Sequence, residues 1–128
     1  MFSFNPNQEQ SWQALADLGV GWVRLQVRMG EYDPEQTALV LRVFDEGYGL
    51  WLTLTHRDRS NITNPERLDR DQRGSYPPAD AERYQALVRR TIAPLVEHLQ
   101  AEGKDPGVWL VVQMGNEVIP SDVAPDTP

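Results

Sequence analysis

Two polar residues, Asn116 and Glu117, follow an apolar segment and a glycine, Gly115, near the end of the sequence. This segment, residues 108–114, is rich in β-branched and aromatic residues and lacks the apolar–polar alternation of a half-buried strand. It therefore predicts a strand buried on both faces, as in a parallel sheet. A carboxylate at the carboxyl end of such a strand lies where α/β barrels carry general acids and bases. The alternative is an ordinary strand followed by a polar turn, with Glu117 solvated.

Polar side chains also lie within or just after two earlier predicted strands, residues 21–27 and 49–56. These side chains are Arg24, Gln26, His56, Arg57 and Asp58. Because the carboxyl ends of parallel strands meet at one edge of a sheet, we expect Arg24, His56 and Glu117 to gather around a common cavity.

Each of these polar residues also has a structural interpretation. Arg24 can lie at an edge with its charged end in water, and His56 can be a strand-end histidine that holds no ligand. Asp58 fits a turn better than a catalytic role. The tryptophans of the predicted strands are expected in the core, although one at the rim could stack on a sugar ring. These tryptophans are Trp22, Trp51 and Trp109.

Helical segments separate the predicted strands. Residues 8–18 form the first helix, and the second begins at Asp33-Pro34, with a capping Asp and a first-turn Pro, and ends before Gly47. Asp80 caps a long third helix, in which Pro94 should cause a kink or a division near Thr91. Residues 103–107 form the turn into the last strand. The long polar segment 57–79 is typical of a functional loop.

Alternating helices and strands predict an α/β fold whose sheet is parallel with right-handed crossovers. The chain opens directly into a helix and ends in a polar loop, and a three-strand sheet would leave apolar edges unpaired. We therefore expect residues 1–128 to form a single partial domain, about half of a (β/α)8 TIM barrel, that belongs to something longer.

Composition limits the partners and the chemistry. A net charge of −7 and scattered basic residues exclude a nucleic-acid partner, because phosphate binding needs clustered Lys and Arg. No apolar run approaches the ~20 residues that cross a bilayer, and no signal peptide is visible, which leaves the compartment open. The sequence has no Cys, and His98 belongs to a helix far from His56, so we expect no metal and no cofactor. Sequence signatures of zinc hydrolases, nucleotide-binding loops and serine hydrolases are absent.

Four segments together carry a resemblance to a known group. They are residues 18–24, residues 49–56, Tyr76-Pro77-Pro78 followed by a helix, and residues 113–117. In this order they resemble clan A glycoside hydrolases, the (β/α)8-barrel retaining glycosidases with cellulase-like and xylosidase-like members. The chain would then run from the first helix through strand four.

The resemblance implies a role for each matching residue. Glu117 would be the catalytic acid/base and Asn116 would contact the sugar 2-hydroxyl, while Arg24 and His56 would line the substrate pocket. Val118 stands where many members have Pro, which leaves the subfamily and the sugar open.

Retaining glycosidases use two carboxyl groups about 5–5.5 Å apart. The resemblance places the second, the nucleophile, on strand seven, which the chain does not contain, so we expect the isolated chain not to hydrolyse glycosides at an appreciable rate. One alternative is a non-catalytic carbohydrate-binding or self-assembling half-barrel that associates through its exposed sheet edges. Another is a different barrel enzyme, such as an aldolase or an isomerase of sugar phosphates.

Overall fold

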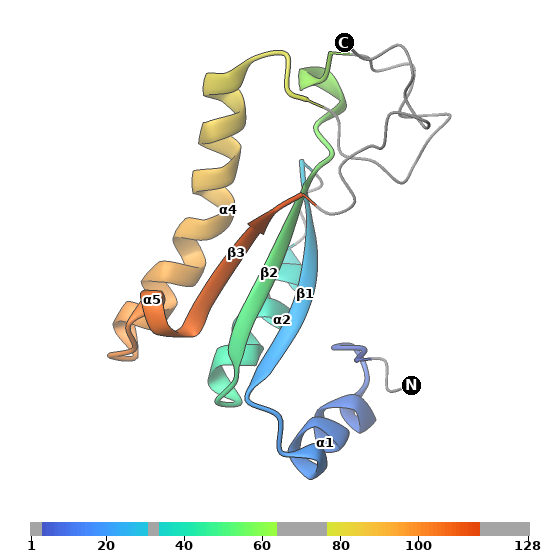
Figure 1. The fold of residues 1–128 in the computed structure, drawn as a ribbon, viewed down its shortest axis with the longest axis vertical. Helices are drawn as coiled ribbons and strands as arrows, with labels where there is room; N and C mark the ends of the chain where they lie inside the picture. Colours follow the sequence, from blue (N-terminus) through green and yellow to red (C-terminus); the bar gives the residue numbers. More distant parts are fainter. Residues whose placement is uncertain (1–3, 31–33, 64–76, 116–128) are drawn as a thin grey trace.

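The structure, a computed structural model, describes residues 4–30, 34–63 and 77–115 (Figure 1). The chain is α/β, with parallel strands that alternate with helices, as predicted. Its elements are α1 (Glu9–Leu18), β1 (Trp22–Met29), α2 (Pro34–Asp45), β2 (Gly49–His56), the short 3-10 helix η1 (Arg59–Asn61), α4 (Ala81–Ala101), α5 (Pro106–Trp109) and β3 (Leu110–Met114).

The strands form one sheet in the order β1-β2-β3, and both neighbouring pairs are parallel. The order in space therefore follows the order in the sequence, without a reversal of direction. In the register, Arg24 lies beside Trp51 and Trp51 lies beside Val111. The next residues on the same face are Gln26, Thr53 and Gln113, again side by side.

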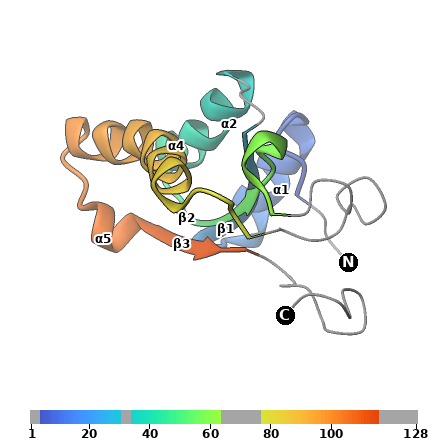
Figure 2. The same cartoon turned by 90° about the horizontal axis from the view of Figure 1, so that it is seen from above.

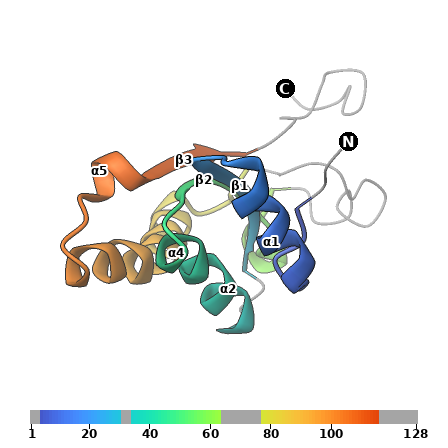
Figure 3. The same ribbon diagram turned by 90° about the horizontal axis from the view of Figure 1, so that it is seen from below.

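Helices α1, α2 and α4 all lie on one side of the sheet (Figures 2 and 3). This side holds the core, because alternate strand residues point toward the helices and are removed from water. The buried apolar residues are Val23, Met29, Leu50, Leu52 and Leu54 from the strands, and Trp12, Leu15, Val40, Val43, Phe44, Leu95 and Leu99 from the helices. The opposite side of the sheet carries no described helix.

Local sequence explains where the helices begin and end. Asp80 caps α4 by accepting a hydrogen bond from the Arg83 backbone N–H at 3.1 Å, and Asp105 caps the single turn α5 in the same way through Gly107 at 2.9 Å. Gly19 ends α1 with a φ of 66°, a left-handed conformation that glycine adopts without strain.

Three expectations from the sequence are wrong. At Pro94 the expected division of the third helix is wrong, since α4 runs unbroken from Ala81 to Ala101, while the alternative of a kink stays a prediction. The last strand does not begin at Val108, because Pro106 starts a helical turn that includes Val108 and Trp109, and β3 begins only at Leu110. This strand is not buried on both faces either, as Val111 is 43% exposed.

The tryptophans of the first two strands are not in the core. Trp22 and Trp51 are 49% and 47% exposed, because both belong to the side of the sheet that the described helices do not cover. Trp109 is half-buried in α5 and packs against the core, with the Lys104 ammonium 4.7 Å from its ring centre. The alternation of helix-facing and uncovered residues shows a sheet with one buried face.

Candidate functional site: the uncovered face of the sheet

The residues of the sheet that face away from the helices form a surface that we call the open face. It consists of Trp22, Arg24, Gln26, Arg28, Trp51, Thr53, Thr55, Val111 and Gln113. Its aromatic and apolar residues belong to the first half of the strands, and its amide and hydroxyl groups lie further toward the carboxyl ends. An apolar floor below convergent polar groups is the usual composition of a small-molecule site.

A chain of hydrogen bonds links the aromatic part of the open face to the end of β3. The Trp51 indole Nε1 donates to Oε1 of Gln113 at 3.0 Å, and Nε2 of Gln113 donates to the carbonyl oxygen of Gly115, also at 3.0 Å. The Gly115 backbone N–H in turn donates to the Leu54 carbonyl at 2.7 Å, and Gly115 has a φ of 76°. Gln113 therefore fixes the turn that immediately precedes Asn116.

Arg24 lies on the open face, with its side chain directed along the sheet toward the carboxyl ends. Its Nε donates to Oγ1 of Thr53, two residues beyond its register partner Trp51 on the neighbouring strand, at 3.3 Å. Thr53 is only 1% exposed although it belongs to the open face, so it is covered by the side chains around it. The Arg24 side chain itself is exposed to solvent.

Trp22 lies flat against the start of the neighbouring strand. A Cβ added to Gly49 would meet the six-membered ring of Trp22 at 2.6–2.7 Å, so only glycine leaves room for the indole there. The ring thus covers the amino end of the open face and presents a flat apolar surface beside Trp51.

His56 lies on the other side of the sheet. It is 3% exposed and packs edge-to-face on Tyr84 of α4, with the ring centres 5.1 Å apart. Burial raises the pKa of the Tyr84 phenol. Arg24 and His56, which we predicted to line one pocket, therefore project from opposite faces, and the role of His56 in substrate binding stays a prediction.

Asp58 is a turn residue in the structure, at the carboxyl end of β2. It caps η1 through the Ser60 backbone N–H at 3.1 Å, accepts from the Ser60 hydroxyl at 2.6 Å and pairs with Arg83 at 2.8 Å. These partners, the Ser60 hydroxyl first, hold the pKa of the Asp58 carboxyl below its usual value. Gly30 approaches it closely, since a Cβ there would lie 2.7 Å from the Asp58 backbone nitrogen.

Asn116 and Glu117 lie outside the described residues, as do Val118 and Tyr76. What the structure describes is the strand that leads to them and the turn at Gly115 that Gln113 holds. Sequence reasoning missed Gln113 and the hydrogen-bonding role of Trp51. The signal was present in the polar Gln113, which interrupts an otherwise apolar strand.

Two other features of the described chain lie away from the open face. A cavity of about 530 Å³ lies between the end of β1, α2 and α4, on the helical side of the sheet; Arg28, Arg83 and Arg90 are among its lining residues. The second feature is a group of metal-ligating side chains, Asp45, His98 and Glu102, at the amino end of the sheet. Among the described residues, Arg28 is the one lining residue of the cavity that belongs to the open-face register, and the metal-ligating group shares no residue with the open face.

Comparisons with protein-family models, with curated proteins and with solved structures find no match to this chain. Among the residues that the structure describes, no helix is long and apolar enough to cross a membrane.

Proposed function

We propose that this chain is part of a (β/α)8-barrel glycoside hydrolase of the retaining type, with Glu117 as its acid/base and Asn116 as a contact of the sugar. In this proposal the open face of the sheet lines the interior of the barrel, and its polar carboxyl end is the floor of the substrate site. The partner is a carbohydrate.

The observation that carries the proposal is the combination of strand order and one-sided helices. In a (β/α)8 barrel, consecutive parallel strands are neighbours, all helices lie outside, and the interior face is filled by side chains. A doubly wound sheet instead places helices on both faces and reverses its strand order. The order β1-β2-β3 with α1, α2 and α4 on one side agrees with the barrel arrangement (Figure 2).

The distribution of residues on the open face supports the same proposal. Barrel interiors are packed by bulky side chains, and their chemistry lies at the carboxyl ends of the strands. Here Trp22, Trp51 and Val111 supply apolar side chains near the amino ends of the strands. Gln113 and Thr53 lie nearer the end that leads to Glu117.

The mechanism assigns each group a step. Glu117 protonates the departing glycosidic oxygen and then deprotonates the attacking water, which requires a site that raises the pKa of its carboxyl group. Asn116 orients the sugar through its 2-hydroxyl. Arg24, already directed toward the carboxyl end by Thr53, holds the carboxylate nucleophile that another strand supplies. His56, buried on the helical side of the sheet against Tyr84, takes no step in this mechanism.

Oligosaccharide binding by the chain tests this proposal. We expect saturable millimolar binding of cello- or xylo-oligosaccharides by calorimetry, reduced about tenfold in Arg24→Ala and in Trp51→Ala. Glu97→Gln, an exposed change on α4, serves as the control and leaves the affinity unchanged. Equal affinities in all three variants, or no binding of any oligosaccharide, would contradict the proposal.

Self-assembly is the second candidate function, and the exposed apolar part of the open face favours it. Within the described sheet, β1 and β3 each have one neighbour, and Trp22, Trp51 and Val111 are between 43% and 49% exposed. A second copy that covers this face would bury them. A compact dimer by light scattering that Trp51→Lys dissociates would support assembly, and a stable monomer would exclude it.

A further inference from the structure

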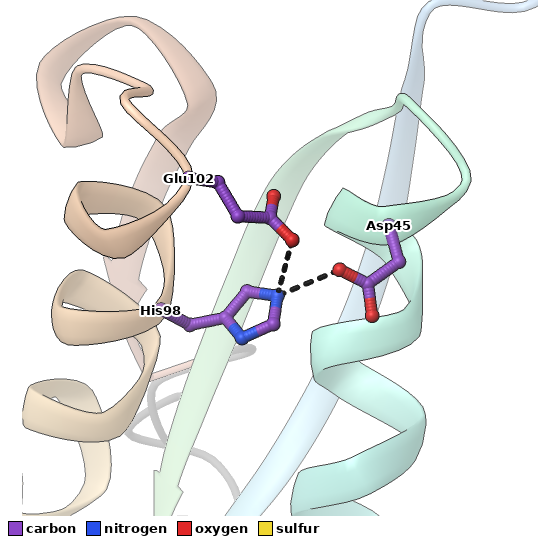
Figure 4. Close-up of side chains that lie close together, drawn as sticks. All are labelled: Asp45, His98 and Glu102. Carbon is purple, nitrogen blue, oxygen red and sulfur yellow. Dashed lines mark hydrogen bonds and ion pairs between the residues drawn. The ribbon is translucent and has the colours of Figure 1, made fainter.

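One cluster of side chains unrelated to the open face joins two helices at the opposite end of the sheet. Asp45 is the last residue of α2, and His98 and Glu102 lie at the end of α4 (Figure 4). The His98 Nε2 atom lies 2.7 Å from Oδ1 of Asp45 and 3.1 Å from Oε1 of Glu102. One ligand atom from each residue lies within 4.8 Å of the other two.

We propose that Asp45, His98 and Glu102 bind a divalent transition-metal cation of the zinc type, which fastens the end of α2 to the end of α4. An imidazole nitrogen with two carboxylate oxygens is a donor set that zinc accepts, with water at the fourth position. The imidazole nitrogen disfavours magnesium and calcium, which take oxygen ligands.

The separations between the donor atoms fit such an ion after a small adjustment. Tetrahedral zinc with bonds of about 2.1 Å holds its ligand atoms about 3.4 Å apart. The two observed separations, 2.7 and 3.1 Å, must each widen by less than about 1 Å. The side chains are 27% to 50% exposed, which permits that movement and gives the ion a route from solvent.

The electrostatics of the helix ends also favour a cation at this point. Asp45 and Glu102 both lie at helix carboxyl termini, where the helix dipole adds to their negative charge.

The surroundings orient two of the ligands. The His98 ring stacks on Phe44 at 6.5 Å between centres. Lys104 lies 3.2 Å from Oε2 of Glu102, the oxygen that points away from His98, and donates to the Phe44 carbonyl at 2.9 Å. Lys104 therefore leaves Oε1 of Glu102 directed at the imidazole, although its own charge weakens the attraction for a cation.

The proposed role of the ion is structural. It would join the end of α2 to the end of α4, just before the chain enters β2 and the segment that leads to β3. This amino end of the sheet is opposite to the end that leads to Glu117, so the cluster shares no residue with the proposed substrate site. The inference therefore stands independently of the proposed glycosidase function.

Calorimetric titration of the metal-free chain with zinc chloride tests the proposal. We expect one ion per chain, at least tenfold weaker binding in His98→Gln and in Glu102→Gln, and unchanged binding in Glu97→Gln, a neighbour on α4 outside the cluster. Zinc should raise the Tm of the wild-type chain but not of His98→Gln.

Two results would overturn the proposal. One is the absence of saturable zinc binding up to millimolar concentration. The other is an affinity that His98→Gln and Glu102→Gln leave unchanged while circular dichroism shows both variants folded. Either result would mean that His98 serves only as an ion-pair partner of the two carboxylates.

Discussion

The indole nitrogen of Trp51 lies 3.0 Å from the side-chain carbonyl oxygen of Gln113, on the strand beside it. Because the Gln113 amide also donates to the Gly115 carbonyl, one side chain connects an aromatic residue on the open face to the turn before Asn116 and Glu117. The geometry of that turn therefore depends on a residue of β2 as well as on β3.

Trp51 and Gln113 should be energetically coupled. Trp51→Phe removes the donor, and Gln113→Leu removes both the acceptor and the bond to Gly115. We expect a coupling free energy of unfolding of about 0.5–1.5 kcal/mol in a double-mutant cycle measured with urea. Additive effects of the two substitutions would show that this hydrogen bond does not hold the two strands in register.

Gly30 should tolerate no side chain. Its φ of 100° is a conformation that L-residues rarely adopt, and a Cβ would lie 2.7 Å from the Asp58 backbone nitrogen. We expect Gly30→Ala to lower the free energy of unfolding by about 2 kcal/mol or more. Gly21→Ala is the control, since nothing lies within 4 Å of its added Cβ and the change should stay within about 0.5 kcal/mol. Equal effects of the two substitutions would contradict the close approach.

Asp58 should stabilise the chain in a pH-dependent way. Its pKa is lowered in the folded state, chiefly by the Ser60 hydroxyl. The stabilisation is therefore fully present above the unfolded-state pKa, about 4, and is lost as the pH falls through the lower folded-state pKa. We expect Asp58→Asn to cost about 1 kcal/mol at pH 7 and progressively less below pH 4.

The control for this effect is Asp17→Asn, whose described partner is the neutral Gln13. Unfolding curves of both variants from pH 2 to pH 7 give the comparison. A difference between Asp58→Asn and wild type that is constant over this range would show that the charge of Asp58 contributes nothing.

The proposed acid/base role predicts that Glu117→Gln separates proton transfer from the rest of catalysis, measured in a protein that joins this chain to a strand supplying the proposed nucleophile. We expect kcat/KM to fall by about 10²–10⁴ for glycosides with poor leaving groups, which need protonation, and much less for activated aryl glycosides, whose kcat is limited by slow hydrolysis of the glycosyl-enzyme. Azide needs no deprotonation to attack, so it should restore turnover of the activated substrates. Equal losses on both substrate types, without azide rescue, would remove Glu117 from the acid/base role.

The elements could largely be predicted from the sequence because they follow local rules. The strand at Gly49–His56 agrees residue for residue, and Asp80 begins a helix where its capping side chain predicts one. The errors arose where a local signal has two meanings. The apolar run at Trp109 fits a helical turn as well as a strand, and Pro94 is accommodated in a helix whose neighbouring residues pack against the core.

The candidate site was harder to predict from the sequence. The face of the sheet that a side chain occupies depends on the register of its strand, which the sequence does not state. His56 and Arg24 both lie on strands that were correctly predicted. Successive residues of a strand point to opposite faces, and in the register of β1 and β2 Arg24 shares a face with Trp51, whereas His56 shares the other face with Met29. The meeting of Asp45 with His98, 53 residues apart, depends on how α2 and α4 pack, which no local pattern reveals.

The central claim is that the open face binds sugar, and NMR titration with cello- and xylo-oligosaccharides tests it most directly. The chain carries its own internal control, since the Trp51 indole N–H lies on the open face while the Trp12 indole N–H donates to the Pro6 carbonyl on the helical side. We predict saturable shifts of the Trp51 indole and Gln113 amide signals, with the Trp12 signal unmoved. Shifts confined to Trp12 and other helix-side residues, or no shifts with any oligosaccharide, would contradict the claim.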